Sequence, residues 1–295
     1  MAAELGRAGI WTFTLDQLPA TRARELAAEI ETMGWGAIWV PEAVGRDPMV
    51  NAALLLSGTE RCVVATGIAS IYARDPMAMN AGWQTLSEAF PSRFLLGLGV
   101  SHQPMVEGMH GGTYGPPLAT MREYLDRMDA ALYLAAPPTE PPERVLAALG
   151  PKMLELARER TRGAHPYLVT PEHTATARKI LGPDCLLAPE QKVVLETDPA
   201  RARAIAREAL AIYIPQIPNY VNNLRRLGFT EDDLGDPPSD RLVDALVAWG
   251  TVDDIAARVQ AHHDAGADHV AVQVLPLTDI DRVLADYWTL AAVLP

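Results

Sequence analysis

The stretch RFLLGLGVSHQP, residues 93–104, is an apolar run that carries two glycines and then turns polar. Residues 93–99 predict a buried strand, and Ser101 and His102 come directly after it. The stretch lacks the third glycine of the G-x-G-x-x-G pattern, and the next helical periodicity begins only at about residue 118. It is therefore not a dinucleotide-binding loop. Its glycines are typical of a strand that passes close to a bulky ligand or to a neighbouring backbone.

Similar apolar runs recur along the chain and alternate with segments of helical periodicity. The candidate strands are residues 8–13, 36–40, 62–68, 93–99, 144–148, 164–169, 185–195 and 268–275. Apolar strands that alternate with helices predict a parallel sheet, and eight of them closed into a ring form a (β/α)₈ TIM barrel. The alternative is a doubly wound open sheet, which needs a glycine-rich turn after its first strand to bind a dinucleotide. The stretch WTFTLDQLP supplies no glycine there.

Helix starts are marked by capping residues. Asp75, Thr170 and Asp198 each precede a proline, a pattern that predicts an N-cap followed by the first helical residue. Thr251 is a further N-cap candidate, and Gly266 is expected to end that helix. We expect one domain spanning residues 1–295. Its helical insertion, at about 198–250, lies between strands seven and eight.

The composition excludes several classes of function. The chain has 25 basic and 37 acidic residues, a net charge of −12, so nucleic acid and anionic membranes are not expected partners. No targeting segment or long uncharged apolar run is present, which predicts a cytoplasmic protein. Cys62 and Cys185 lack metal-ligand or redox spacing and are expected to be buried thiols. His262 and His263 are expected to be solvated on a polar helix face, and no metal site is predicted.

Catalytic residues of such barrels follow the carboxyl ends of the strands. Glu42 follows the second strand, Gly67 to Tyr72 lie at the end of the third, and Ser101 and His102 follow the fourth. His102 is either a proton-transfer group or a hydrogen-bonded structural histidine. Glu42 is either functional, paired with Arg46, or bound to a backbone amide.

Two motifs at strands three and four resemble a known family. GIASIYARDP (67–76) and SRFLLGLGVSHQP (92–104) are similar to the luciferase-like monooxygenase superfamily. More narrowly, they resemble its actinobacterial branch of oxidoreductases that use coenzyme F420, a deazaflavin. The resemblance runs from GWGAIWVPE (34–42) to AWGTVDDIAARVQAHHDAGADHVAVQ (248–273).

This resemblance implies a TIM barrel that holds the deazaflavin ring at the strand ends. Many relatives have a non-prolyl cis peptide after strand three, and Gly67-Ile68 occupies that place here, with a plain bulge at Gly67 as the alternative. The resemblance also implies a cofactor phosphate beside the loops after strands five and six, and a homodimer. The residues expected to bind the cofactor are Gly67, Ile68, Ala69, Ser101, Gly150, Pro151, Val169, Thr170 and His173.

The chain departs from one branch of the family. Related sugar-phosphate dehydrogenases carry a histidine after the acidic residue of strand two and a glutamate after strand four. Ala43 and His102 stand at those places here, which argues against sugar-phosphate oxidation. We expect an F420-dependent oxidoreductase for a small organic substrate, in which His102 exchanges the proton and Glu42 orients cofactor or substrate. The alternatives are an FMN-dependent monooxygenase and a non-catalytic flavin or deazaflavin binder.

Overall fold

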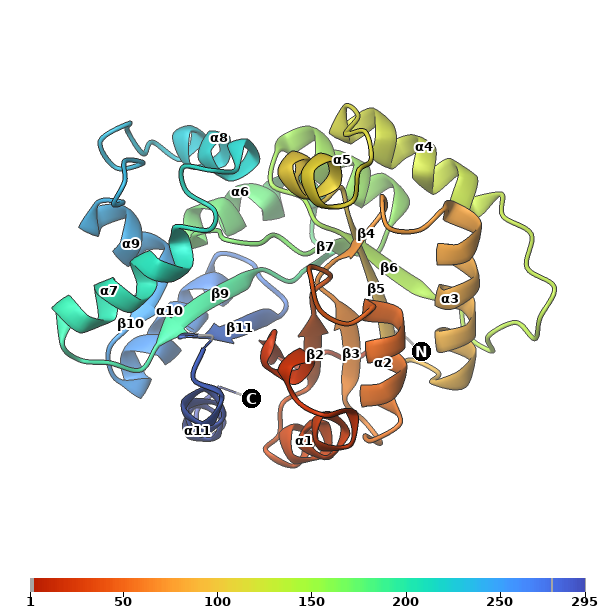
Figure 1. Cartoon of the computed structure of the whole chain (residues 1–295), viewed down its shortest axis with the longest axis horizontal. Helices are drawn as coiled ribbons and strands as arrows, with labels where there is room; N and C mark the ends of the chain where they lie inside the picture. Colours follow the sequence, from red (N-terminus) through yellow and green to blue (C-terminus); the bar gives the residue numbers. More distant parts are fainter. Residues whose placement is uncertain (1–2, 277, 295) are drawn as a thin grey trace.

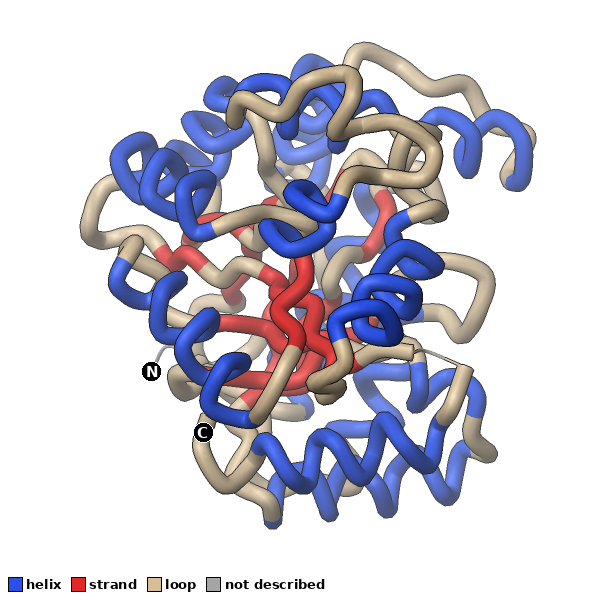
Figure 2. Tube along the Cα trace, turned by 90° about the vertical axis from the view of Figure 1, so that its left-hand side faces the viewer, coloured by secondary structure: helices blue, strands red, loops and turns tan. Residues whose placement is uncertain are grey.

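The computed structural model describes residues 3–276 and 278–294 and contains one parallel sheet surrounded by helices (Figures 1 and 2). The strands are β1 (Ala8–Trp11), β2 (Ala37–Val40), β3 (Val63–Thr66), β4 (Ala69–Ser70), β5 (Phe94–Gly99), β6 (Glu143–Leu146), β7 (Gly163–Ala164), β8 (Leu186–Leu187), β9 (Glu190–Val194), β10 (Val247–Trp249) and β11 (Val270–Val274). The strand pairs are parallel.

The sheet closes into a barrel. Its order runs from β9 through β11, β1, β2, β3, β5, β6 and β7 to β8. Only Ala188 and Pro189 separate β8 from β9. The amide of Ala188 donates to Ala164 of β7, and the carbonyl of Pro189 accepts from Ala271 of β11. The two short strands therefore act as one, where the sequence predicted a single strand over 185–195. This arrangement confirms the predicted TIM barrel.

Helices enclose the barrel, as Figure 2 shows. They are α1 (Ala20–Thr32), α2 (Pro48–Leu56), α3 (Pro76–Ala89), α4 (Pro117–Asp129), α5 (Pro151–Arg160), α6 (Pro171–Leu181), α7 (Pro199–Leu210), α8 (Pro218–Arg226), α9 (Asp240–Leu246), α10 (Val252–Asp264) and α11 (Ile280–Leu290), with short helical turns at Thr14–Gln17 and Pro104–Met109. No helix among residues 3–276 and 278–294 is both long and apolar enough to cross a membrane.

The capping chemistry predicted from the sequence is present. Asp75 and Asp198 accept hydrogen bonds from backbone amides in the first turns of α3 and α7. Thr170 caps α6, and Thr251 forms a capping box with Asp254 at the start of α10. Because each cap satisfies amides that lack a helical partner, it fixes where the helix begins after its strand.

The chain between β9 and β11 contains the expected helices α7, α8 and α9, which lie together at one side of the barrel (Figure 1, left). It also contains β10, which the sequence analysis missed and which pairs with the outer edge of β9. Apolar side chains of α7, α8 and α9, including Leu210, Leu224 and Leu242, share a second apolar core with barrel residues such as Val194 of β9. The insertion therefore packs against the barrel.

Two side-chain expectations need correction. His262 was expected to be solvated, but it is fully buried between Thr174 Oγ1, at 2.8 Å, and Gln191 Oε1, at 2.9 Å. Its helix turns this residue toward the sheet, while His263 is half-buried. Cys62 is buried as expected, whereas Cys185 is half-buried, and both are free thiols.

Candidate active site

A cavity of about 400 Å³ lies at the carboxyl ends of the strands. Its lining residues include Trp11 at the end of β1, Gly99 at the end of β5 and Gln273 in β11. The insertion contributes Tyr213 and Tyr220 to the opposite wall. The walls are mostly apolar and aromatic, which suits a flat organic ligand.

The sequence-predicted residues divide into two groups. Those that line the cavity are Glu42, Gly67, Ile68, Ser101, His102 and Gly150. Those outside its lining are Ala69, Pro151, Val169, Thr170 and His173. The structure therefore brings together the residues after β2, β3 and β5. It keeps most of the segment after β7, the sixth strand predicted from the sequence, behind the wall.

The peptide bond between Gly67 and Ile68 is cis, which confirms the prediction made for this position. The carbonyl oxygen of Gly67 accepts a hydrogen bond of 3.1 Å from Trp11 Nε1. A Cβ on Gly67 would lie 2.7 Å from the same indole nitrogen and 3.0 Å from His165 Nε2. Glycine is needed here because two side chains already occupy that space.

Gly97 and Gly99 lie so close to neighbouring protein atoms that neither position has room for a Cβ. A Cβ on Gly97 would lie 2.0 Å from the carbonyl oxygen of Thr66, and one on Gly99 would lie 2.4 Å from the Ile68 side chain. Thr66 Oγ1 also donates to the Gly97 carbonyl, at 2.7 Å. Gly97 therefore shows the predicted close approach of a neighbouring backbone, while Gly99 meets a side chain and also lines the cavity.

Glu42 is engaged by protein groups. Arg74 donates two hydrogen bonds to its carboxylate, of 2.9 and 2.8 Å, and the backbone amide of Ser70 donates a third, of 2.7 Å. Arg46, the partner considered from the sequence, instead donates to the carbonyls of Leu15 and Leu18. The carboxylate thus ties the segment after the cis peptide to the end of β2.

His102 is half-buried at the cavity wall, and its ring lies 5.3 Å from that of Tyr220. Burial lowers the pKa of the His102 imidazole below its usual value, while a hydrogen bond with the Asn219 side chain offsets part of this effect. Its Nδ1 is buried and has no hydrogen-bond partner among the described residues. A neutral imidazole with a free ring nitrogen can accept or pass on a proton.

The segment that joins β7 to α6, with the first turn of α6, supports the wall from behind. His173 Nε2 lies 2.9 Å from the carbonyl oxygen of Leu149, and burial lowers the pKa of this histidine. Thr170 Oγ1 accepts from the His173 amide as the cap of α6. His173 thus holds Leu149, which lines the cavity next to Gly150.

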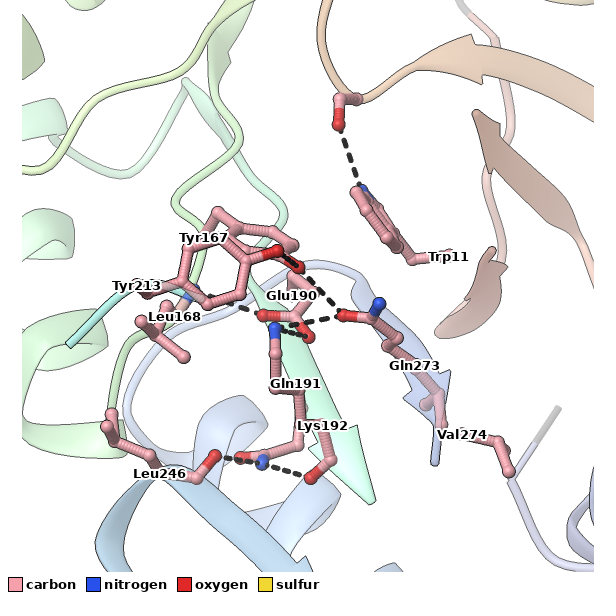
Figure 3. A network of polar contacts seen from close by, with 12 residues as sticks. Trp11, Tyr167, Leu168, Glu190, Gln191, Lys192, Tyr213, Leu246, Gln273 and Val274 are labelled. Carbon is pink, nitrogen blue, oxygen red and sulfur yellow. Dashed lines mark hydrogen bonds and ion pairs between the residues drawn. The ribbon is translucent and has the colours of Figure 1, made fainter. Parts of the chain in front are cut away.

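A buried polar network that was not predicted from the sequence lies on β9 and β11 (Figure 3). Lys192 Nζ lies 3.0 Å from Glu190 Oε1 and 2.9 Å from Gln273 Oε1, and it sits 3.8 Å from the Tyr167 ring centroid. The Tyr167 hydroxyl donates to the same Gln273 oxygen and contacts the Tyr213 hydroxyl. Desolvation raises the pKa of Glu190 and lowers that of Lys192, and each charge partly offsets the effect on the other.

A signal for this network was present in the sequence. Glu190, Gln191 and Lys192 interrupt an otherwise apolar run at residues 185–195. Alternation along a strand turns Glu190 and Lys192 to one face and Gln191 to the other. Gln191 meets His262 on the helix side, so the ion pair faces the barrel interior.

A second missed residue, His165, lies deeper in the same cavity. Its ring stacks on Trp39 with centroids 4.1 Å apart, and its Nδ1 lies 2.6 Å from the carbonyl oxygen of Ala188. Burial lowers the pKa of His165 to about 3, so the ring is neutral. Because Nδ1 must donate to the carbonyl, Nε2 is an acceptor, and it has no partner among the described residues.

The structure is a closed parallel barrel with an apolar cavity at the carboxyl ends of its strands. This is the end of a TIM barrel at which enzymes of this fold carry their active sites. The family model "Luciferase-like monooxygenase" matches residues 7–269. The chain belongs to this family.

One curated relative and two solved structures are similar to most or all of the chain. Rv3520c of Mycobacterium tuberculosis, whose name describes a coenzyme F420-dependent oxidoreductase, is 26% identical over 315 residues, covering 86% of this chain and 91% of that protein. Among solved structures, an F420-dependent secondary alcohol dehydrogenase with an F420-acetone adduct matches all of both chains with a TM-score of 0.79 and 13% identity. The oxygenating constituent of 3,6-diketocamphane monooxygenase of Pseudomonas putida, in complex with FMN, has a TM-score of 0.68 and 15% identity, covering 98% of this chain and 97% of that one. The two structural likenesses show the fold.

Proposed function

We propose that this protein is a coenzyme F420-dependent oxidoreductase that acts on a small organic substrate. The observation that carries the proposal is the apolar cavity beside Gly67-Ile68, in a chain whose relative Rv3520c is named for F420. When bound, the deazaflavin supplies hydride chemistry at its C5 carbon. The substrate class is an alcohol or its carbonyl counterpart, or an activated alkene.

The residues present fit a deazaflavin ring. Ile68, Val100 and Met153 supply apolar surface in the cavity wall. Gln273 Nε2 is a buried donor and His165 Nε2 a buried acceptor, and both lack protein partners among the described residues. A ring system with a polar edge of carbonyl and N–H groups would satisfy such atoms.

The phosphate end of the cofactor has a candidate site at the rim. Gly150 is the N-cap of α5, and no side-chain oxygen caps this helix. Arg226 Nη2 lies 3.7 Å from the position that a Cβ on Gly150 would take. A helix N-terminus beside a guanidinium suits a phosphate, so we assign the phosphate to α5 and Arg226. Thr170 and His173 then act by supporting Leu149.

His102 is the proposed proton-transfer residue, since it combines a free ring nitrogen with a position in the cavity wall. Hydride transfer to a carbonyl carbon must be balanced by a proton on the oxygen, and the reverse reaction must release that proton. Glu42 has the role of a positioning residue, because its carboxylate is taken up by Arg74 and Ser70. The aromatic insertion residues exclude water from the reacting atoms.

An FMN-dependent monooxygenase is the second candidate, supported by the family match and by the FMN-bound structural neighbour. The test is a pair of separate fluorescence titrations with F420 and FMN, followed by turnover assays of the loaded protein. Preferred binding of F420 supports the proposal, together with oxidation of reduced F420 by carbonyl compounds or reduction of oxidised F420 by alcohols. Preferred binding of FMN, with oxygen consumption, contradicts it. Tight F420 binding without turnover of any substrate identifies a non-catalytic binder.

A further inference from the structure

The orientation of the Gln273 amide is fixed by its neighbours. Lys192 Nζ and the Tyr167 hydroxyl contact the same side-chain atom of Gln273, at 2.9 and 3.0 Å. An ammonium group can only donate, so this atom must be the amide oxygen. Figure 3 shows the oxygen turned toward Lys192 and Tyr167 and the nitrogen on the other side.

The nitrogen of that amide is left without a protein partner. Gln273 is 1% exposed and lines the cavity, and its Nε2 has no hydrogen-bond acceptor among the described residues. A buried donor without an acceptor costs about 1–3 kcal/mol. The network on the other side holds Gln273 in this state, which is expected where a ligand supplies the acceptor.

The charges around Gln273 select the kind of acceptor. Lys192 is the only lysine or arginine among the described cavity-lining residues, and Glu190 neutralises it at 3.0 Å. An anionic oxygen at Gln273 would be buried near the Glu190 carboxylate without a counter-ion of its own, which is unfavourable. The site therefore favours an uncharged oxygen.

We propose that Gln273 Nε2 binds a neutral carbonyl oxygen of the ligand and that Lys192 and Tyr167 position it for this task. This inference deepens the proposed function and rests on it for the identity of the ligands. Two sources can supply the oxygen: a ring carbonyl of the deazaflavin, or the carbonyl of the organic substrate. Either source makes Gln273 a determinant of what the cavity accepts.

The first experiment observes Gln273 directly. The side-chain amide of Gln273 is assigned by NMR in ¹⁵N-labelled wild-type protein and followed while oxidised F420 is added, then while cyclohexanone or acetophenone is added to the F420-saturated protein. A shift of this amide with F420 assigns the oxygen to the cofactor. A shift only with the ketones assigns it to the substrate. An amide that moves with neither overturns the inference, even if F420 binds.

The second experiment removes the donor and keeps the acceptor. In Gln273→Glu, a carboxylate oxygen still accepts from Lys192 and Tyr167, while a second oxygen replaces Nε2. The dissociation constant of the ligand that moved the amide should rise at least about tenfold, because a donor has been exchanged for an acceptor. Gln260→Glu, on the outer helix α10, is the matched control and should bind both ligands like the wild type.

The outcomes separate the two proposals. If the wild type binds neither F420 nor FMN, the proposed function fails, and titration of the cofactor-free protein with the ketones still tests Gln273. If F420 binds and Gln273→Glu, still folded by circular dichroism, retains wild-type affinity for F420 and ketones, the Gln273 assignment fails alone. If Gln273→Glu does not fold, the wild-type amide titration decides.

Discussion

Arg74 holds the carboxylate of Glu42 through two hydrogen bonds of 2.9 and 2.8 Å, and both side chains are largely shielded from water. The same carboxylate accepts from the amide of Ser70 in β4. Arg74 also pairs with Asp47, the N-cap of α2. One ion pair therefore joins β2, the segment after the cis peptide, and the start of a helix.

Glu42→Gln should destabilise the protein. The amide oxygen can still accept from Ser70 and from Arg74 Nη1, but the amide NH₂ group then replaces the oxygen that accepts from Arg74 Nη2. One hydrogen bond and the negative charge are lost, so the free energy of unfolding should fall by about 1–3 kcal/mol. Urea denaturation measures this change. Glu25→Gln, which removes an exposed surface ion pair with Arg22, is the control and should change stability by less than about 0.5 kcal/mol. A Glu42→Gln variant of unchanged stability that loses turnover would return Glu42 to a catalytic role.

Gly97→Ala should be strongly destabilising. The new methyl group would lie 2.0 Å from the carbonyl oxygen of Thr66, so β3 and β5 would have to separate. Overpacking of this kind costs about 1–3 kcal/mol or more. Gly108→Ala is the matched control, because nothing lies within 4 Å of its Cβ position. Equal urea midpoints for the two variants would contradict the close contact between Gly97 and Thr66.

Much of the fold was predictable because its signals are local. Apolar runs gave the strands, and the caps at Asp75, Thr170 and Asp198 gave helix starts that the structure confirms. Strand β10 was missed because Val247–Trp249 follows α9 directly, with no turn residue between them. Its pairing with β9 is set by tertiary contacts.

Site residues that directly follow a strand could be predicted from the sequence. Gly67 and His102 line the cavity because the carboxyl ends of parallel strands meet at one edge. Glu190 and Lys192 were missed because two charged residues in an apolar run do not by themselves show that they are buried as an ion pair. Gln273 lies 81 residues from Lys192 in sequence, so only the closed barrel brings them together.

The burial of His262 was missed for the same reason. Its partners Thr174 and Gln191 are 88 and 71 residues away, so the helix alone cannot reveal which face is covered. A pair of adjacent histidines on an amphipathic helix reads as polar surface until the packing of α10 against the sheet is known.

Buried neutral histidines should make the protein sensitive to acid. Burial lowers the pKa of His262 and His165 to about 3 and that of His269 to about 4. The unfolded chain binds these protons below about pH 6.5, whereas the folded chain does not until the pH is far lower. The stabilisation is thus complete above pH 6.5 and decreases as the pH falls. Between pH 7 and pH 5 each histidine should contribute a loss of about 2 kcal/mol in the free energy of unfolding.

A single variant tests this assignment. His262→Gln retains groups that can bond to Thr174 and Gln191 but cannot take up a proton. Its free energy of unfolding, measured by urea titration, should fall less steeply between pH 6 and pH 5, by about one proton's slope of 1.4 kcal/mol per pH unit. His110→Gln, at an exposed histidine, should keep the wild-type slope. Identical slopes for all three proteins would contradict a neutral, buried His262.

Loss of His102 should slow the chemical step and spare cofactor binding. If His102 transfers the proton, His102→Ala should lower the turnover number by about 10²–10⁴-fold, with little change in F420 affinity. Because burial lowers the pKa of this imidazole below 6.5, the neutral form predominates at neutral pH. In substrate oxidation, where the imidazole accepts the proton, kcat/KM of the wild type should fall as the pH drops through that pKa.

The reverse reaction, substrate reduction, should have the opposite pH dependence. Substrate reduction needs the protonated imidazole, so its rate should fall as the pH rises through the same pKa, and His102→Ala should abolish both pH dependences. His110→Ala, at an exposed position, should retain the wild-type profiles. A structural His102 would instead lower the unfolding temperature and leave the rate per folded molecule intact. The assignment fails if His102→Ala, folded and loaded with F420, turns over within about threefold of the wild type, well short of the loss expected for a general acid–base group.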